Sequence, residues 1–210
     1  MDFTEILREI ELVKSGSKPT HASALLLYFS KPSASTRRIL ELGSGSGIVS
    51  IGLAKLYKRN VVGLEIVEDL VWAAKKSAEI NGVNDKVKFL EGDVRDIKKI
   101  FKAESFDMVV SNPPHHIGKE KSPNKLRALA RNASFKTIDI FINAISWSLK
   151  NGGEFSLVLS PENLIDWLCA LREKRLEVKK MVFFHPKDKA ELVALRGKKN
   201  AKSGLIVERI

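Results

Sequence analysis

Short β-rich runs alternate with helical stretches from residue 37 of this chain onward. The alternation predicts a parallel sheet with helices on both faces, because a parallel strand needs a crossover segment to bring the chain back. The expected strands cover residues 38–42, 60–66, 87–90, 106–110 and 154–160, and the expected helices cover 46–58, 68–81, 137–150 and a segment that opens at Pro161. Three later runs, at 178–185, 191–196 and 204–209, are expected to close the sheet.

A length of 210 residues suits one α/β domain with a sizeable core. We expect residues 37–210 to form this domain and residues 1–36 to form a helical extension that packs on it. No apolar run reaches the roughly 18 residues that a membrane-spanning helix needs, so we expect no membrane span. The single cysteine, Cys169, excludes an internal disulfide and favours a reducing, cytoplasmic location. Its position in a helical run of leucines predicts a buried thiol.

The net charge of +11 is concentrated in two segments. Residues 117–136 hold six Lys and Arg against one acidic residue, and residues 171–210 hold twelve against five. Clustered cations favour a polyanionic partner, and in a cytoplasm that is mostly nucleic acid, although a solubilising surface is the alternative. The side chains expected to contact RNA are Lys119, Lys121, Lys125, Arg127, Arg131, Lys198 and Lys199.

A glycine-rich loop follows the first expected strand, in the run Glu41-Leu42-Gly43-Ser44-Gly45-Ser46-Gly47. Three glycines at alternate positions allow a tight turn and let a ligand approach the main chain. Ile48 occupies the position where the dinucleotide-binding pattern has its last glycine, and no Gly-Lys-Ser/Thr marks a P-loop. The loop therefore matches neither the dinucleotide-binding pattern nor a P-loop, and by itself it does not define the ligand, because many nucleotide-binding folds have a glycine loop.

Acidic residues stand at the ends of the next two expected strands. Glu65 ends the second strand, where a carboxylate can accept hydrogen bonds from both hydroxyls of a ribose. Asp93 follows the third strand, where it could accept from the exocyclic amine of adenine. Because ligands of such sheets bind beyond the carboxyl ends of the strands, these groups are expected to share one site with the glycine loop.

The glycine loop, Glu65 and Asp93 together resemble the motifs of class I S-adenosylmethionine-dependent methyltransferases. The resemblance implies a single doubly wound, Rossmann-like α/β domain with a seven-stranded, mostly parallel sheet. It also implies S-adenosylmethionine as the cofactor, with the glycine loop under its methionine part. Glu65 would hold the ribose, and Asp93 with the Val94 backbone the adenine. The implied cofactor-binding residues are Glu41, Gly43, Gly45, Gly47, Glu65, Ile66, Asp93, Val94 and Asn112.

The most specific motif is Ser111-Asn112-Pro113-Pro114-His115, at the end of the fourth expected strand. An aromatic amino group is a poor nucleophile, because its lone pair is delocalised into the ring. The Asn112 side-chain oxygen can accept one of its N–H bonds and the Pro113 carbonyl the other, while the prolines stiffen the turn. Positioning of this kind can supply most of the catalysis without a strong base. The expected catalytic residues are Asn112, Pro113, Pro114 and His115.

This motif resembles that of amino-group methyltransferases. Ser122-Pro123-Asn124 followed by Ala128-Leu129-Ala130-Arg131 further resembles bacterial tRNA adenine-N6 methyltransferases, as does the segment from Pro19 to Leu27. That resemblance implies methylation of the adenine just 3′ of the anticodon of a valine tRNA. An RNA substrate also fits the physical argument, because a loop base is accessible whereas a duplex base must be flipped out.

Three alternatives remain open from the sequence, and a fourth is set aside. The run His115-His116-Ile117-Gly118 after the prolines also resembles guanine-N2 methyltransferases of ribosomal RNA. Glutamine methylation of a protein and a catalytically inactive, cofactor-binding RNA adaptor are two more. A metal site at the paired histidines is the fourth, and we expect none, because a metal site usually takes three or four ligands.

Overall fold

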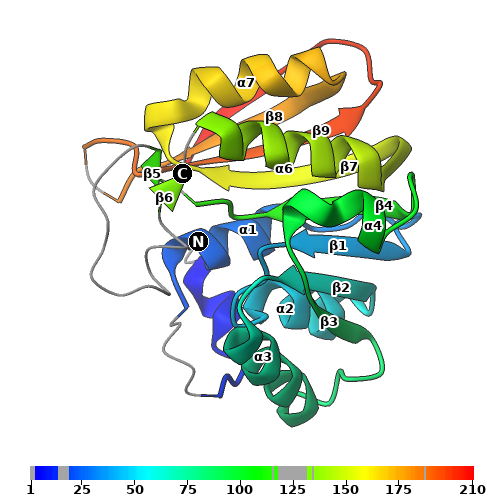
Figure 1. The fold of residues 1–210 in the computed structure, drawn as a ribbon. Helices are drawn as coiled ribbons and strands as arrows, with labels where there is room; N and C mark the ends of the chain where they lie inside the picture. The colour runs from blue at the N-terminus through cyan, green and yellow to red at the C-terminus, as the bar shows by residue number, and fades with distance from the viewer. Residues whose placement is uncertain (1–2, 14–18, 115, 118–131, 134, 187) are drawn as a thin grey trace.

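The computed structural model describes residues 3–13, 19–114, 116–117, 132–133, 135–186 and 188–210. Its main sheet has the strand order β10-β8-β9-β7-β4-β1-β2-β3 (Figure 1). The strands are β1 (Arg38–Leu42), β2 (Asn60–Glu65), β3 (Val87–Glu91), β4 (Phe106–Ser111), β7 (Leu149–Leu159), β8 (Leu176–Phe184), β9 (Leu192–Lys199) and β10 (Ile206–Arg209). A two-stranded sheet pairs β5 (His116–Ile117) with β6 (Asn132–Ala133).

The sheet is mostly parallel, as the alternating pattern predicts. Strands β3, β2, β1, β4 and β7 pair in parallel, and β9 is inserted antiparallel between β7 and β8. The described residues give this sheet eight strands instead of the seven expected. The count of seven came from the family resemblance; the run expected at 204–209 forms β10, which pairs in parallel with the outer side of β8. Because β8 and β10 run in the same direction as β4, their ends reach the same edge of the sheet.

Helices cover both faces, and each face has its own core (Figure 1). One core is formed with α1 (His21–Phe29), α2 (Ile48–Tyr57) and α3 (Glu68–Ile80). The other is formed with α4 (Ile97–Ile100), α6 (Phe135–Ser148) and α7 (Leu164–Glu173). Strands β1, β2 and β4 are buried on both faces, so their residues contribute alternately to the two cores.

Local signals explain where the helices begin and end. The Thr20 side chain caps α1 by accepting from the Ser23 N–H, and Glu68 and Asp69 place negative charge in the first turn of α3. Gly82, with φ of 64°, follows the end of α3. Helix α2 begins at Ile48, two residues later than expected, because Gly47 is still in the left-handed conformation.

The N-terminal segment contains a 3-10 helix, η1 (Phe3–Leu7), followed by residues without helical structure. Backbone groups of this segment bind α3, since the Glu11 N–H donates to Asn81 Oδ1 and the Val13 N–H to Ser77 Oγ. On the opposite face Cys169 is exposed, so the prediction of a buried thiol is wrong. Helix α7 turns its Trp167 and Leu171 side toward the core instead. Within the described part of the chain, every helix is too short or too polar to cross a membrane.

Candidate active site

The glycine loop and the Asn-Pro-Pro motif leave the tips of two neighbouring strands. Strands β1 and β4 are parallel and adjacent, and Leu42 is in register with Ser111. Gly43 and Asn112 are therefore each one residue beyond a paired position, on strands about 4.8 Å apart. The Ser111 hydroxyl ties the two tips together by donating to the Leu42 carbonyl over 2.8 Å. The structure thus brings together the two motifs that the sequence assigns to donor and acceptor.

The glycine loop has the conformation that its glycines allow. Gly43, Gly45 and Gly47 have φ angles of 71°, 54° and 80°, in the region where a side chain is strained. A Cβ atom at Gly43 or Gly45 would meet no heavy atom within 4 Å, whereas one at Gly47 would stand 2.5 Å from the Phe89 ring. Gly47 is thus required for packing, while Gly43 and Gly45 leave open space above the loop.

Glu65, at the end of β2, turns its carboxylate toward that loop. Oε2 accepts from the Gly45 N–H over 2.8 Å, and Oε1 accepts from the Ile66 and Val67 N–H groups over 3.0 and 3.1 Å. A carboxylate has about four acceptor positions, so these three bonds leave further capacity on Oε2. The side chain is mostly buried, which fixes the carboxylate at the junction of β1 and β2.

Glu41 lies deeper, within β1, and is only 3% exposed. Its Oε2 accepts from the backbone N–H of Ser50 over 2.9 Å and also from the Ser50 hydroxyl. Ser50 lies in the first turn of α2. The pKa of Glu41 is raised to about 8. Burial is the largest cause and repulsion from Glu65 adds to it, while the two Ser50 hydrogen bonds act in the opposite direction. The site therefore contains a buried carboxyl group whose ionised form would gain from a nearby positive charge.

Asp93 follows β3 and caps the short 3-10 helix η2 (Val94–Asp96). Its Oδ1 accepts from the Arg95 N–H and its Oδ2 from Arg95 Nε, each over 2.8 Å. The Arg95 guanidinium lowers the pKa of Asp93 against the opposing effect of burial, so this carboxylate is ionised at neutral pH. As with Glu65, the hydrogen bonds orient the carboxylate and leave it some acceptor capacity.

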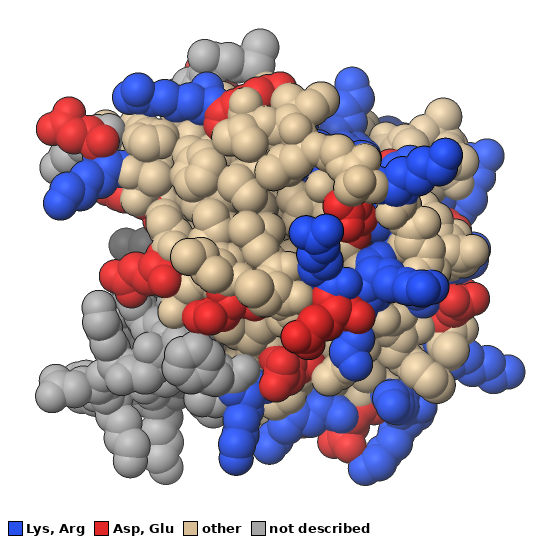
Figure 2. Space-filling view, turned by 90° about the horizontal axis from the view of Figure 1, so that it is seen from above, with Lys and Arg blue, Asp and Glu red and all other residues tan. Residues whose placement is uncertain are grey.

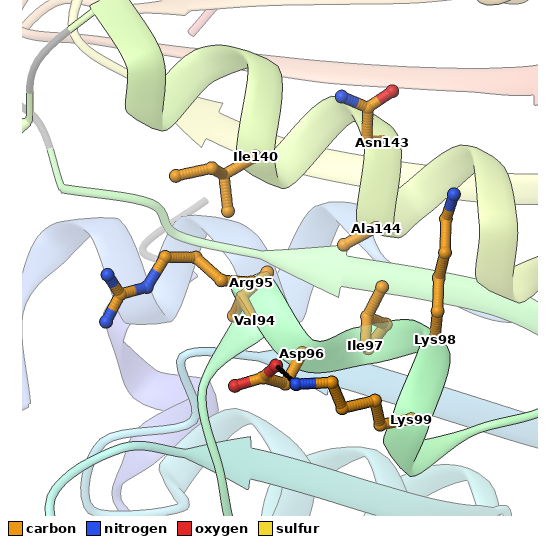
Figure 3. Close-up of a pocket in the computed structure, with 9 residues that line it drawn as sticks. All are labelled: Val94, Arg95, Asp96, Ile97, Lys98, Lys99, Ile140, Asn143 and Ala144. Carbon is orange, nitrogen blue, oxygen red and sulfur yellow. Dashed lines mark hydrogen bonds and ion pairs between the residues drawn. The ribbon is translucent and has the colours of Figure 1, made fainter.

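A cavity of about 330 Å³ begins directly after Asp93, between η2 and α4 on one side and α6 on the other (Figure 3). Val94, Ile97, Ile140 and Ala144 supply apolar walls, and the polar lining residues are Arg95, Asp96, Lys98, Lys99 and Asn143. The Lys99 ammonium pairs with Asp96 over 2.7 Å. The apolar walls of such a cavity can hold a flat heterocycle.

The Asn112 side chain presents a buried acceptor at the end of β4. Its Oδ1 atom is buried and has no hydrogen-bond partner among the residues that the structure describes. Buried polar atoms are nearly always hydrogen-bonded, and those that are not often have a catalytic or binding role. Pro113 beside it is buried, whereas Pro114 is partly exposed, so the turn is anchored at Pro113.

The predicted RNA-contacting residues divide into two groups. The five cations between Lys119 and Arg131 lie outside the described residues, as does the predicted catalytic residue His115. Lys198 and Lys199 lie at the end of β9, in register with Glu154 and Leu176, which places them at the edge of the sheet opposite the site. Lys198 pairs with Glu154 over 3.3 Å. Figure 2 shows Lys and Arg mainly along the right-hand and lower margins of that view, with a largely uncharged area across its upper centre.

Lys199 is tied into the structure by several acceptors. Its ammonium donates to the carbonyls of Ser146 and Leu149, over 2.8 and 2.9 Å, and to Glu104 Oε1 over 3.1 Å. Its side chain is 13% exposed. It therefore satisfies carbonyls at the end of α6, and it is not brought to the site.

Two site residues have no counterpart among those predicted. Ser50 and Arg95 hold the carboxylates of Glu41 and Asp93, and both lie at a helix beginning, where free N–H groups attract carboxylates. The sequence did contain a signal for each of these two residues. Ser50 stands shortly after the glycine loop, and Arg95 stands two residues after Asp93. Among the described residues, no three metal-ligating side chains gather into a possible metal site.

Comparison with known proteins agrees with this geometry. The family described as "Methyltransferase small domain" matches residues 9–169. A curated relative from Phocaeicola vulgatus, named tRNA1(Val) (adenine(37)-N6)-methyltransferase, is 27% identical over 157 residues, which cover 75% of this chain and 66% of the relative. The chain thus spans less than two thirds of that relative's length.

Two solved structures share the fold. A predicted O-methyltransferase from Agrobacterium tumefaciens aligns with a TM-score of 0.68 and 21% identity, covering 88% of this chain and 84% of the other. A 16S rRNA N2 G1207 methyltransferase from T. thermophilus, in complex with AdoMet and guanosine, aligns with a TM-score of 0.64 and 28% identity, covering 89% of this chain and 45% of the other. From its sequence and its fold, the chain belongs to the methyltransferase small domain family, with S-adenosylmethionine as the cofactor.

Proposed function

We propose that this protein transfers a methyl group from S-adenosylmethionine to an exocyclic amino group of an RNA base, namely adenine N6 in a tRNA. The observation that carries the proposal is the Asn112 Oδ1 atom, which is buried, has no partner among the described residues, and lies one strand away from the glycine loop. That atom is an acceptor in need of a donor, and the N–H of an aromatic amine is such a donor.

The acceptor chemistry follows from the turn at the end of β4. The Asn112 side chain accepts one N–H of the amine, and the Pro113 carbonyl accepts the other. These two bonds favour a pyramidal nitrogen, whose lone pair is then available for the methyl group. S-adenosylmethionine supplies that methyl group on a sulfonium, which is already a strong donor. Alignment is therefore the main task of the protein.

The cofactor is proposed to lie across the tips of β1, β2 and β3. The open space above Gly43 and Gly45 admits its methionine part, and Glu65 has acceptor capacity left for the ribose hydroxyls. Ile66 is exposed beside Glu65, and the cavity after Asp93 and Val94 suits the adenine. Glu65 gives this side of the site a negative charge, and the ionised form of Glu41 would add to it, which suits a cofactor that carries a sulfonium and an ammonium.

The choice of RNA rests on the charge and on the relatives. The chain carries a net charge of +11, and relatives of 24–33% identity are named as enzymes of adenine 37 in tRNA1(Val). His115 remains a predicted catalytic residue of the acceptor turn, and Lys119, Lys121, Lys125, Arg127 and Arg131 remain predictions for contacts to that RNA. A tRNA substrate would place the protein in the cytoplasm.

A second candidate is the guanine-N2 position of ribosomal RNA. It is favoured by the 28% identity to the T. thermophilus enzyme, whose complex contains guanosine. The same turn at Asn112 could accept from the amine of guanine, because both bases present an NH₂ group on an aromatic ring.

Incubation with methyl-labelled cofactor tests the proposal. Total tRNA and total rRNA serve as separate substrates, and the products are digested to nucleosides and separated. Labelled N6-methyladenosine from tRNA is the expected result, and labelled N2-methylguanosine from rRNA would favour the second candidate. Label in neither RNA, from protein that binds the cofactor in a parallel titration, would overturn an RNA methyltransferase function.

A further inference from the structure

Two cations belong to the opposite walls of the cavity that follows Asp93. Arg95 of η2 lines one wall, and its side chain is 68% exposed. Lys136 lies in the first turn of α6, the helix that forms the other wall, and is also exposed. Because α6 packs against η2, these two side chains come from neighbouring elements although they are far apart in the sequence.

The direction of α6 places Lys136 at the end of the cavity that opens toward the active site. Ile140 and Asn143 line the cavity, and Lys136 lies on the same side of the helix, one turn before Ile140. Helix α6 ends directly before Leu149, which is in register with Phe106 at the beginning of β4. The first turn of α6 therefore lies toward the edge where β4 ends. Arg95 lies at this same edge, just after the end of β3.

Arg95 is oriented by its ion pair with Asp93. Its Nε and Nη2 atoms donate to Asp93 Oδ2. A guanidinium has more N–H groups than these two bonds use, so it can bind another acceptor as well. Figure 3 shows the guanidinium directed out of the cavity, away from Lys98 and Lys99. Because the ion pair already restricts this side chain, little further conformational freedom is lost when it binds a ligand.

The cofactor gives these two cations no partner. The adenine that the cavity is proposed to hold is uncharged, and S-adenosylmethionine contains no phosphate. The carboxylates of η2 are already paired within the protein, Asp93 with Arg95 and Asp96 with Lys99. An anion from outside the protein is therefore the natural ligand, and an RNA strand carries one at every nucleotide.

Given the proposed function, on which this inference depends, we propose that Arg95 and Lys136 bind a backbone phosphate of the RNA close to the methylated base. The free edge of the guanidinium and the Lys136 ammonium donate to the two unesterified oxygens of that phosphate. Strands β1 and β2 lie between β3 and β4, so the phosphate site and the acceptor turn are about three strand spacings, or about 14 Å, apart. The RNA strand thus runs from the acceptor turn across the opening of the cavity.

The test titrates an RNA stem-loop that wild type methylates, without cofactor and at several salt concentrations. Arg95→Gln and Lys136→Gln are each expected to raise the Kd for this RNA about threefold to fivefold at low salt. In the double variant, the slope of log Kd against log salt concentration should fall by about 0.7, the value for one phosphate of a single strand. Asp139→Asn removes an exposed negative charge one turn after Lys136, and should lower the Kd about twofold.

Lys75→Gln is the control, because it makes the same change of charge on the exposed side of α3. Its Kd and slope should match those of wild type. Arg95→Gln also removes the partner of Asp93, so Lys136→Gln tests the phosphate site independently of the cofactor pocket. The cofactor Kd of Lys136→Gln should stay within twofold of wild type.

Two failures can be told apart in this experiment. If wild type methylates no RNA, the proposed function is wrong and this inference falls with it. If wild type is active and both Arg95→Gln and Lys136→Gln keep its Kd and slope, the inference alone is overturned. An equal loss in Lys75→Gln, or a higher Kd in Asp139→Asn, would also contradict a phosphate site at this place.

Discussion

Polar groups are used differently at the two edges of the main sheet that the strand ends form. One edge holds the carboxyl ends of β1 and β4, and the other lies at the opposite end of these strands. At the edge where β1 and β4 end, Asn112 Oδ1 is unpaired among the described residues, and Glu65 and Asp93 keep acceptor capacity beyond their existing bonds. At the opposite edge the charges are matched to one another. Glu154 pairs with Arg196 and Lys198, and Lys199 donates to three acceptors.

This difference separates function from stability. Polar groups that already have partners within the protein gain little from a ligand, whereas a buried acceptor without a partner costs stability until a ligand donates to it. Substitutions at the first edge should therefore change catalysis and binding, and those at the second edge should change the free energy of unfolding. Each of the following predictions tests one side of that division.

The largest effect is expected for Asn112→Ala. Losing one of the two acceptors that align the amine should lower kcat roughly 100- to 1,000-fold, by analogy with the loss of one aligned polar group in other active sites. The cofactor Kd should change by less than about threefold. The exposed Asn84, in the turn before β3, provides the control, and Asn84→Ala should behave as wild type. Substantial turnover by Asn112→Ala would contradict the proposed chemistry of the acceptor turn.

The next effect belongs to the opposite edge. Lys199→Ala leaves the carbonyls of Ser146 and Leu149 without their donor, and should lower the free energy of unfolding by about 1.5–3 kcal/mol. Chemical denaturation measures this change. RNA affinity, measured at the same salt concentration, should be unchanged. A variant that keeps its stability but binds RNA less tightly would restore the sequence-based prediction that Lys199 contacts RNA.

Gly45→Ala tests the open space above the glycine loop. A Cβ atom there would stand where the cofactor is proposed to lie, so the cofactor Kd should rise about tenfold or more. Gly82→Ala is a matched control, because Gly82 also has a positive φ and nothing within 4 Å of an added Cβ, but lies after α3. Both variants should lose some stability from backbone strain. Calorimetric titration should show weaker binding for Gly45→Ala alone.

The smallest expected effect concerns Glu41. Its pKa of about 8 means that the carboxyl group is mostly protonated at pH 7. A cationic cofactor favours the ionised form, so binding should release a proton and the affinity should rise with pH, by about fivefold at most between pH 7 and 8. Titrations in buffers of different ionisation enthalpy measure the proton. In Glu41→Gln the release and this pH dependence should both disappear.

The fold was largely predictable from the sequence because its signals are local. Strand and helix alternation, the glycines after β1 and the Asn81-Gly82 helix end each depend on a few neighbouring residues. The run at 204–209 was also predicted to be a closing strand, but its place beside β8 was not, because an edge strand with exposed side chains has no burial pattern to indicate its neighbour. The glycine loop and the Asn-Pro-Pro turn were also easy to place, since Gly43 and Asn112 each follow directly after a strand.

The charge pattern did not indicate which cations have partners within the protein. Lys198 and Lys199 contribute to a basic segment, yet their side chains point to partners that are distant in the sequence, such as Glu104 and Glu154. Those partners become visible only when β9 is paired with β7. The hydrogen bonds of Asp93 with Arg95 and of Glu41 with Ser50 were likewise absent from the motif-based prediction, because motifs name the carboxylates and not the groups that orient them.

The antiparallel insertion of β9 has a consequence for how this chain acquires its structure during synthesis. Strand β7 lies in the middle of the finished sheet, but the strand that covers its outer side is made from residues 192–199, after β8. Until those residues leave the ribosome, the buried strand β7 has an unpaired edge that other chains could join. A ribosome that stalls before residue 199 would therefore hold an aggregation-prone intermediate, in which the glycine loop and β4 can already form.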